Sequence, residues 1–402
     1  MKVLIVEEAL QGLHGHYFQY LRDMAEGGRQ AGHEIELLAH VNACDEIKNV
    51  LGAHPVLRRS VVGQAHAGSP LQRLKEVASH NRNLRDDVLR WAEESNTSFD
   101  ATIFPSVRLD HIWALHAIRK KDCGRRLGHL IAILIDAPGN FDSAGRYHYP
   151  RSSWLLRLSL WWIAGTPRRS GLSFAAESAG MVRQFENFSR RHFGYVPHVT
   201  EMPKLVTRLN TSESFSSNPL TLGTFGFTRF DKGHDVLQNA IKKIPESDHA
   251  SFHFVIQWTG DYRLPDGVLV EKDPQLMRSC HVTYLPRFSN SEEYHNWLSR
   301  VDAIILPYRE AFYQDRLSRV AIDAALVGLP VVYPRRTWLA EFFSSYGAGV
   351  AFDAESPTSL TEAIITLKRD YGALVKQAKN NIEKTRRDFS GQEFFSCVGR
   401  ML

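Results

Sequence analysis

Two acidic side chains, eight positions apart, lie in a stretch that alternates between apolar and polar residues. Asp315 falls in a polar segment, and Asp323 falls in a helix that we expect to begin near Ser318. The apolar runs 303–306 and 329–333 flank this segment and predict two buried strands joined by that helix. Such a unit binds ligands at the carboxyl ends of its strands, where carboxylates accept hydrogen bonds from sugar hydroxyls.

The backbone at the start of the same helix suits an anion. The first N–H groups of a helix have no partner within it, so those around Leu317 and Ser318 are free to bind a negatively charged group. Ser318 is a plausible N-cap residue, and Gly328 falls where a left-handed C-cap is expected.

A pair of cations follows another apolar run, at residues 220–225. Arg229 and Lys232 come after this expected strand and before the expected helix that contains Leu237 and Ala240. Two cations at a strand-to-helix junction stabilise the charge that develops on a leaving diphosphate. Solvated cations in a turn are the alternative.

The N-terminal half offers three more candidate residues. Gly15 and His16 lie between an expected strand at 2–6 and an expected helix at 17–30, where a glycine lets the backbone approach a phosphate. His16 could contact a substrate or simply cap and pack the loop. Asp136 follows an apolar run and could act as a base for an acceptor hydroxyl, orient a sugar, or only form a turn before Pro138.

These motifs resemble a known family. Asp315-x7-Asp323-Ala-Ala-Leu-Val-Gly-Leu-Pro-Val-Val resembles the E-x7-E-A-M-A-x-G-x-P-V-V segment of retaining, nucleotide-sugar-dependent glycosyltransferases with the GT-B fold. Gly226 to Ala240 resembles that family's Gly-Arg-x-x-x-x-Lys-Gly segment. The resemblance implies that the first acid contacts the donor sugar, the second contacts the ribose, and the cations hold the diphosphate.

The chain departs from the family pattern at several positions. Both acids are Asp, and Glu310 competes with Asp315 for the first role. Phe227 occupies the position of the family's Arg, so we assign the role of that Arg to Arg229, two residues further on. Asp136 stands where many members carry a histidine. We expect Lys232 and Asp323 to be exposed to the ligand.

The resemblance implies an α/β chain with the GT-B fold, in which two Rossmann-like domains face each other across a cleft. We expect an acceptor domain at 1–206, a Ser/Asn-rich linker at 207–219 and a nucleotide-sugar domain at 220–385. Residues 386–402 would form a helix that crosses back to the first domain.

The implied reaction moves a sugar from a UDP- or GDP-linked donor to a hydroxyl of a glycan, a lipid-linked glycan or a small molecule, with retention of configuration. No Asp-x-Asp motif occurs, so we expect neither a metal site nor a cofactor. Three alternatives to this function stay open: a catalytically weak or inactive partner protein, a nucleotide-sugar epimerase and a phosphorylase.

Composition narrows the class of protein and its partners. With 402 residues, 43% of them hydrophobic and 23% charged, the sequence is typical of a globular protein with two or three domains. Four scattered cysteines and a short apolar run after Met1 favour a cytoplasmic protein without a signal peptide. The net charge of +5 comes with no nucleic-acid-binding module.

One segment suggests a peripheral contact with a membrane. Residues 147–171 interleave Trp, Leu and Arg, as helices at a bilayer interface do. This composition would place the protein at the inner face of a membrane. A protein-binding surface or a core helix uses the same residue types, so these alternatives stay open.

Overall fold

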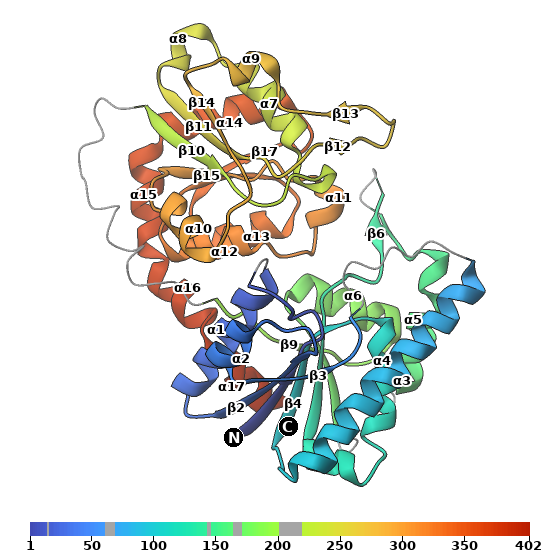
Figure 1. The fold of residues 1–402 in the computed structure, drawn as a ribbon. Helices are drawn as coiled ribbons and strands as arrows, with labels where there is room; N and C mark the ends of the chain where they lie inside the picture. The colour runs from blue at the N-terminus through green and yellow to red at the C-terminus, as the bar shows by residue number, and fades with distance from the viewer. Residues whose placement is uncertain (14–15, 61–68, 143–145, 164–170, 201–218) are drawn as a thin grey trace. The chain divides into compact units, whose positions relative to one another are not determined.

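The computed structural model describes the chain except for residues 14–15, 61–68, 143–145, 164–170 and 201–218. Gly15 and most of the expected linker therefore lie outside the described residues. The chain divides into two compact units (Figure 1). Unit 1 comprises Met1–Asn140, Arg146–Glu201 and Phe389–Leu402, and unit 2 comprises Phe141–Gly145 and Met202–Asp388.

Unit 1 is built on a seven-stranded parallel sheet. Its strand order is β3-β2-β1-β4-β5-β8-β9. The strands are β1 (Lys2–Val6), β2 (Glu34–His40), β3 (Ala53–Leu57), β4 (Ala101–Val107), β5 (His129–Leu134), β8 (Leu172–Ala176) and β9 (Gly194–Tyr195). From β1 the chain adds β2 and β3 on one side and then β4 on the other. The carboxyl ends of β1 and β4 therefore flank the topological switch point, where open α/β sheets bind ligands.

Helices cover both faces of this sheet because successive strand residues point to opposite sides. Val3 and Ile5 pack with α1, α2 and α17, whereas Leu4 and Val6 pack with α3 to α6. The helices are α1 (His16–Gln30), α2 (Asp45–Leu51), α3 (Pro70–Ser95), α4 (Leu109–Ile118), α5 (Trp154–Ile163), α6 (Ala179–Ser189) and α17 (Gly391–Met401). Minor elements are β6 (Asn140–Phe141), β7 (Tyr147–His148) and two 3-10 turns at Cys123–Leu127 and Arg151–Ser153. The C-terminal helix α17 thus completes the N-terminal unit.

Unit 2 contains a six-stranded parallel sheet in the order β14-β11-β10-β15-β16-β17. Its strands are β10 (Leu220–Thr224), β11 (Phe252–Gln257), β14 (Val282–Leu285), β15 (Ala303–Ile305), β16 (Val331–Pro334) and β17 (Gly349–Phe352), with a hairpin of β12 (Tyr262–Arg263) and β13 (Leu269–Val270). The order reverses between β10 and β15, so this unit repeats the switch point of unit 1.

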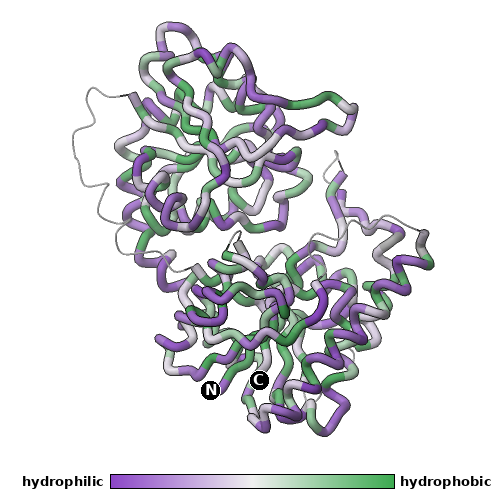
Figure 2. Tube along the Cα trace, viewed as in Figure 1, coloured by the Kyte–Doolittle hydropathy of each residue, from purple (hydrophilic) through white to green (hydrophobic). Residues whose placement is uncertain are grey.

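The helices of unit 2 connect and cover these strands. They are α7 (His234–Lys242), α8 (Glu246–His249), α9 (Pro274–Met277), α10 (Ser291–Leu298), α11 (Glu310–Tyr313), α12 (Arg319–Leu326), α13 (Trp338–Tyr346), α14 (Pro357–Arg369), α15 (Tyr371–Asn380) and α16 (Ile382–Asp388). Hydrophobic residues concentrate along the strands of both sheets (Figure 2). Among the described helices, none combines the length and hydrophobicity needed to span a bilayer.

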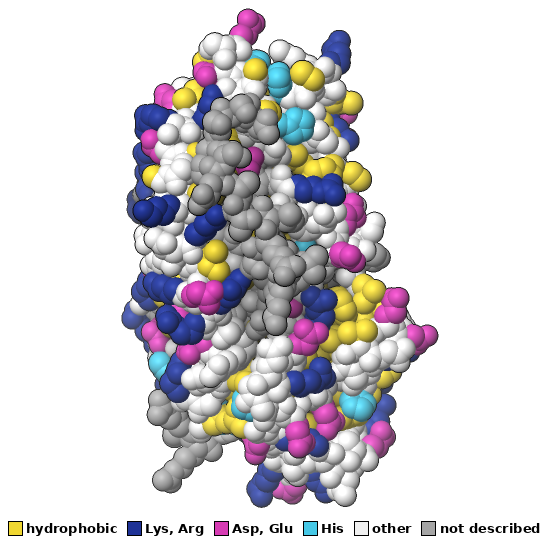
Figure 3. All heavy atoms as spheres, turned by 90° about the vertical axis from the view of Figure 1, so that its left-hand side faces the viewer, with side chains coloured by type: hydrophobic (Ala, Val, Ile, Leu, Met, Phe, Trp, Pro, Cys, Tyr) yellow, Lys and Arg dark blue, Asp and Glu magenta, His cyan; other side chains and the backbone are white. Residues whose placement is uncertain are grey.

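The charged side chains of both signs mix on the surface. On the face drawn in Figure 3, Lys and Arg side chains alternate with Asp and Glu.

Candidate functional site

The loop after β10 approaches the loop after β15 closely at the switch point of unit 2. A 3-10 turn at Phe230–Lys232 leads into α7 through Gly233, whose φ is +66°. A Cβ atom at Gly233 would lie 1.9 Å from the carbonyl oxygen of Pro307. Only glycine suits this position, because it tolerates the left-handed backbone and lets the two loops meet.

Lys232 is half-buried against two aromatic rings rather than exposed, which corrects the expectation from the sequence. Its Nζ lies 3.7 Å from the ring centroid of Tyr308 and 4.8 Å from that of Tyr313. Burial lowers the pKa of Lys232 well below its ordinary value, and Asp231 acts in the opposite direction. An anion bound beside this amine would favour its charged form.

Two arginines join Lys232 around a single carboxylate. Arg229 donates to Asp231 over 2.9 Å, and Arg316 approaches the same oxygen at 3.9 Å. The side chains of Arg229 and Arg316 are 49% and 46% exposed. Two arginines share one acid beside the Lys232 amine, so the carboxyl ends of β10 and β15 carry a positive charge that can attract a diphosphate.

A third arginine is buried and supports this loop from within. Arg309 is 6% exposed and stacks on the ring of Phe230. Its guanidinium donates to Asp235 over 2.7 Å, to Glu355 over 2.9 Å and to the carbonyl oxygen of Phe230 over 2.9 Å. Arg309 therefore fixes the turn that carries Lys232, and the sequence analysis missed it.

Phe227, at the family's Arg position, is 40% exposed. The guanidinium carbon of Arg287, in the loop after β14, lies 4.9 Å from its ring centroid. A cation from another loop is thus available beside the position where the resemblance leads us to expect one.

Asp323, on α12, is 1% exposed, so the expectation of an exposed acid is wrong. Its carboxylate accepts hydrogen bonds from Arg319 Nε over 3.1 Å and from the hydroxyl of Tyr294 over 2.9 Å. Each carboxylate oxygen has a second lone pair. Asp323 can therefore take a ligand hydroxyl only in addition to these two partners.

The other acidic candidates differ in their surroundings. Glu310 accepts hydrogen bonds from both Arg336 Nε and Nη2, at 2.9–3.2 Å. Asp315 and Leu317 are half-buried in the loop between α11 and α12. Ser318 caps α12, as the sequence predicts, and its hydroxyl accepts from the N–H of Ala321.

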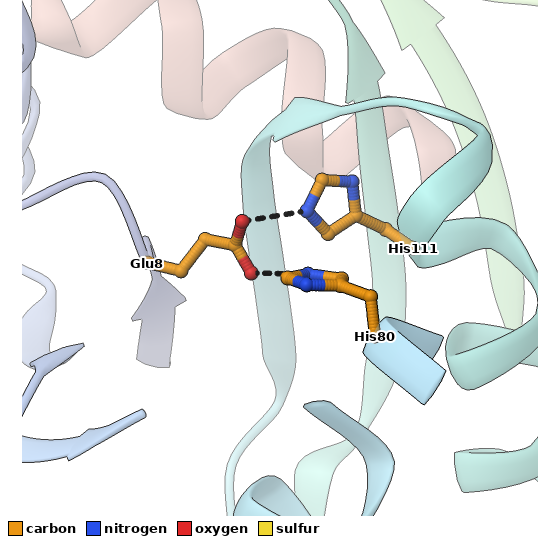
Figure 4. Close-up of side chains that lie close together, drawn as sticks. All are labelled: Glu8, His80 and His111. Carbon is orange, nitrogen blue, oxygen red and sulfur yellow. Dashed lines mark hydrogen bonds and ion pairs between the residues drawn. The ribbon is translucent and has the colours of Figure 1, made fainter. Parts of the chain in front are cut away.

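The switch point of unit 1 holds a second group of polar side chains, on elements that the sequence keeps far apart. Glu7 and Glu8 directly follow β1, Ser106 lies near the end of β4, His111 lies in the first turn of α4, and His80 lies on α3. Figure 4 shows the rings of His80 and His111 directed at the Glu8 carboxylate. The distances from Nε2 of His80 and His111 to the Glu8 oxygens are 2.7 Å and 3.3 Å.

Among the described residues, Glu8, His80 and His111 form a buried group that could hold a metal ion. Two histidines and a carboxylate are common zinc ligands. The hydrogen bonds argue against that use. The backbone N–H of Arg108 donates to Nδ1 of His111 over 2.9 Å, so the proton of a neutral ring resides on Nε2. A ligating histidine normally donates from its second nitrogen, and His111 accepts there instead.

Glu8 is therefore a hydrogen-bonded anion. Burial opposes its ionisation, but His111 and His80 outweigh burial and lower the pKa of Glu8 to about 2. Burial also lowers the pKa of His111, and Glu8 raises it above its usual value. The hydrogen bond from the Arg108 N–H to Nδ1 disfavours protonation of His111, because a doubly protonated ring could not accept it.

Glu7 behaves in the opposite way from its neighbour. It is 2% exposed, and one of its oxygens accepts the N–H of Ala9 over 2.9 Å. Burial raises the pKa of Glu7 to about 7, although the hydrogen bond with Ser106 lowers it. A cavity of about 10 Å³, the room that one water molecule needs, is lined by Glu7, Glu8, Ser106 and His111.

Asp136, His16 and Gly15 are the remaining candidates of unit 1. Asp136 follows β5, as expected, and forms an ion pair with Arg108 at 2.9 Å. His16 is the first residue of α1, but its side chain and Gly15 lie outside the described residues.

One protein-family model matches the second half of the chain. The family model described as "Glycosyl transferases group 1" matches residues 219–370. This range contains Arg229 and Lys232 as well as Asp315 and Asp323. No curated protein sequence matches the chain significantly.

Solved structures match over the whole chain. Sucrose-phosphate synthase from Thermosynechococcus elongatus is 13% identical to this chain, with a TM-score of 0.65. The match covers 100% of this chain and 98% of that chain. HepE from Anabaena, solved with UDP-glucose, is 16% identical, with a TM-score of 0.61 and the same coverage. The catalytic domain of starch synthase IV from Arabidopsis thaliana, bound to ADP and acarbose, is 12% identical, with a TM-score of 0.64 and coverages of 100% and 99%.

Residues 219–370 match the group 1 glycosyltransferase family, and the whole chain has the GT-B fold. The GT-B fold that the sequence motifs predicted is confirmed by these structures. Sequence reasoning selected Arg229 and Lys232 but missed Arg309 and Arg316, which have no fixed spacing from the motif. It also missed the Glu7 and Glu8 pair, although two acids directly after a first strand were a visible signal.

Proposed function

We propose that this protein is a glycosyltransferase that moves a sugar from a nucleotide-diphosphate donor to a hydroxyl acceptor. The observation that carries the proposal is the group of Arg229, Lys232 and Arg316 around Asp231 at the switch point of unit 2. HepE and starch synthase IV, which share the fold, were solved with UDP-glucose and with ADP. These ligands support a nucleotide-sugar donor here, and the resemblance favours one linked to UDP or GDP.

The chemistry follows from where the negative charge develops. As the bond between the sugar and the diphosphate breaks, the leaving group gains charge that fixed cations stabilise. Lys232 and the two arginines would supply that charge without a metal ion. Transfer with retention is our proposal from the resemblance, with Asp315 or Glu310 on the donor sugar, Asp323 on the ribose and the N–H groups near Leu317 and Ser318 on the phosphate.

A donor screen tests this proposal. Nucleotide release from UDP-glucose, UDP-galactose, GDP-mannose and ADP-glucose is measured with and without EDTA. The wild type should release nucleotide from at least one donor, in chelator as well. Lys232→Ala should reduce release at least 100-fold, because about 3 kcal/mol of leaving-group stabilisation is lost.

Lys242→Ala is the matched control, because Lys242 lies at the far end of α7 and pairs with Asp273. Equal loss in both variants would indicate a defect of folding. Full activity of the Lys232 variant would contradict the assignment of the cation group. Nucleotide release without any acceptor product would favour the epimerase alternative, and release that depends on inorganic phosphate would favour a phosphorylase.

We also propose that α5 contacts an anionic membrane surface, where a lipid-linked acceptor would be found. Four large apolar side chains on this ten-residue helix are more than half exposed: Trp154, Leu158, Trp161 and Trp162. Arg191 lies over the ring of Trp161, and Lys120 lies over that of Trp162. Exposed tryptophans bordered by cations fit the interface of a bilayer that carries negative headgroups.

A non-catalytic partner protein is the remaining alternative. Two hydrogen bonds support this alternative, because they already use the candidate acids: Arg319 donates to Asp323, and Arg336 donates to Glu310. Absence of any nucleotide binding would favour this alternative over the enzyme.

A further inference from the structure

His116, in the last turn of α4, carries a buried hydrogen-bond donor without a partner. Its side chain belongs to a residue that is 9% exposed. Nη2 of Arg119 donates to Nδ1 of His116 over 2.8 Å, because a guanidinium can only donate. The proton of the neutral ring therefore resides on Nε2, which has no hydrogen-bond partner among the described residues. A buried N–H group without an acceptor is rare in folded proteins, and this one can donate to a ligand.

The imidazole is neutral and lies in positively charged surroundings. Burial lowers the pKa of His116 to about 4, and the charges of Arg119 and Lys120 act in the same direction. Arg119 is half-buried, and Lys120 is exposed. An anion beside this ring would meet one N–H donor and two cations, which is a favourable set of partners for phosphate oxygens.

One exposed side chain packs on this imidazole. The ring centroid of Trp162, on α5, lies 4.6 Å from that of His116, and Nζ of Lys120 lies 5.8 Å from the Trp162 ring. One turn earlier, Nε1 of Trp113 on α4 donates to Ser159 on α5 over 2.8 Å, and this bond ties the two helices together (Figure 1). Because Trp162 is 59% exposed, a rotation of its side chain would uncover the imidazole without moving the helix.

We propose that the phosphate group of an anionic lipid binds beside His116, in the space that the Trp162 ring leaves when it enters the membrane interface. The inference rests on the proposed contact of α5 with an anionic membrane. The N–H of Nε2 donates to a phosphate oxygen, and Arg119 and Lys120 balance the negative charge. Indole rings favour the headgroup level of a bilayer, so the ring that leaves His116 takes a place beside the same lipid.

A helix that only lies in the interface makes a different prediction. Its tryptophans partition into the bilayer whatever lies beneath them, and its cations attract anionic lipid in proportion to their number. Such a helix would bind as tightly, or more tightly, when a neutral histidine is replaced by a more hydrophobic ring. A phosphate site would bind more weakly, because it loses a hydrogen-bond donor. The sign of the effect therefore separates the two cases.

His116→Phe tests the proposal, because phenylalanine keeps a planar ring against Trp162 but has no N–H group. Co-sedimentation of the full chain is measured with phosphatidylcholine vesicles that contain phosphatidylglycerol, and circular dichroism checks the fold. The variant should bind about tenfold more weakly than the wild type, the effect of one hydrogen bond to a charged group. His54→Phe is the matched control, because His54 also packs on a tryptophan, Trp91, but lies on β3. Its binding should equal that of the wild type.

Lys120→Ala provides a second test that leaves the core undisturbed, since Lys120 is exposed. Lys121→Ala is its control, because it removes the same charge from the next residue, which is exposed as well. Lys120→Ala should weaken binding to these vesicles about fivefold, as expected for a cation in contact with anionic lipid, and Lys121→Ala should weaken it less than about twofold.

The outcomes separate the phosphate site from the membrane contact. Unchanged or tighter binding of a folded His116→Phe variant, or equal losses in the two lysine variants, would overturn the phosphate site and leave the membrane contact intact. A wild type that binds no vesicle would overturn both. Calorimetry with inorganic phosphate in the absence of vesicles identifies the source of the phosphate. We expect no binding there, because Trp162 packs on the imidazole. Binding of inorganic phosphate would overturn the assignment to a lipid.

Discussion

Two adjacent carboxyl groups, Glu7 and Glu8, have opposite pKa shifts although both are buried. The difference is in their hydrogen-bond partners: Glu8 accepts from two imidazoles, whereas Glu7 faces one hydroxyl, one backbone N–H and the charge of Glu8. Burial alone raises the pKa of an acid, and donors that favour the anion reverse this effect.

The raised pKa of Glu7 predicts a pH-dependent cost in stability. The folded state holds this proton up to pH 7 and the unfolded state only up to about 4.5, so stability falls as pH rises through that window. The shift corresponds to about 3 kcal/mol. Glu7→Gln should therefore gain about this much relative to the wild type between pH 4.5 and 7.5, as measured by urea unfolding. A pH-independent difference between the two proteins would contradict the raised pKa.

Arg309 and Arg229 should differ in their effect on stability, although both lie at the switch point of unit 2. Arg309→Ala leaves the carboxylates of Asp235 and Glu355 without their partner, and Asp235 is partly buried, so we expect a loss of about 3 kcal/mol. Arg229 is about half exposed, so Arg229→Ala should cost less than about 1 kcal/mol. Thermal unfolding of both variants measures this, and equal losses would show that burial of Arg309 is not the cause.

Single residues were predictable where a motif fixes the spacing. Local sequence predicts that Ser318 caps a helix. It also predicts a strand-to-helix junction that carries Arg229 and Lys232. The burial of Lys232 between Tyr308 and Tyr313 did not, because a second loop supplies those rings. His80 and His111 were unpredictable as partners of Glu8 for the same reason.

At the scale of elements, the contact of α17 with α1 depends on backbone proximity. A Cβ atom at Gly391 would lie 2.3 Å from the Cα of Gly27, whereas one at Gly399, on the same helix, would meet nothing within 4 Å. Gly391→Ala should destabilise unit 1 by about 1–3 kcal/mol because the helices must separate. Gly399→Ala should be neutral or gain up to about 1 kcal/mol. Denaturant unfolding distinguishes the two, and equal effects would refute the close packing.

The exposed face of α5 gives a second prediction at this scale. Replacement of Trp161 and Trp162 by Ala should reduce co-sedimentation with phosphatidylglycerol vesicles at least tenfold, because both rings would leave the interface. Leu71→Ala is the control, because Leu71 is an exposed apolar residue on a different helix, α3, and its replacement should leave sedimentation unchanged. Unchanged sedimentation of the tryptophan variant would count against membrane contact.

Elements with strong hydrophobic patterns were predictable, and edge elements were not. The strands at 303–305 and 331–334 and the helix between them match the sequence pattern closely. β3 was missed, because Ala-His-Pro-Val-Leu at the edge of a sheet has little of the continuous hydrophobicity of a central strand. The strand at Gly194–Tyr195 is too short to show a pattern.

At the scale of the molecule, each unit has one large parallel sheet, and a group of polar side chains lies at the switch point of that sheet. Unit 2 holds cations there, and unit 1 holds carboxylates and histidines. The resemblance of the motifs to the GT-B family was enough to predict two such sheets. The strand order, which decides which loops meet, depends on long-range packing, and so the sequence could not specify the polar group of unit 1.

The central claim is that the cation group of unit 2 binds a nucleoside diphosphate. Calorimetric titration of the full chain with UDP, GDP and ADP, alongside Lys232→Ala and the control Lys242→Ala, tests it most directly. The account predicts that at least one nucleotide binds the wild type and the control equally and binds the Lys232 variant at least tenfold more weakly. Undiminished binding to the Lys232 variant, or no binding to any of the three proteins, would contradict it.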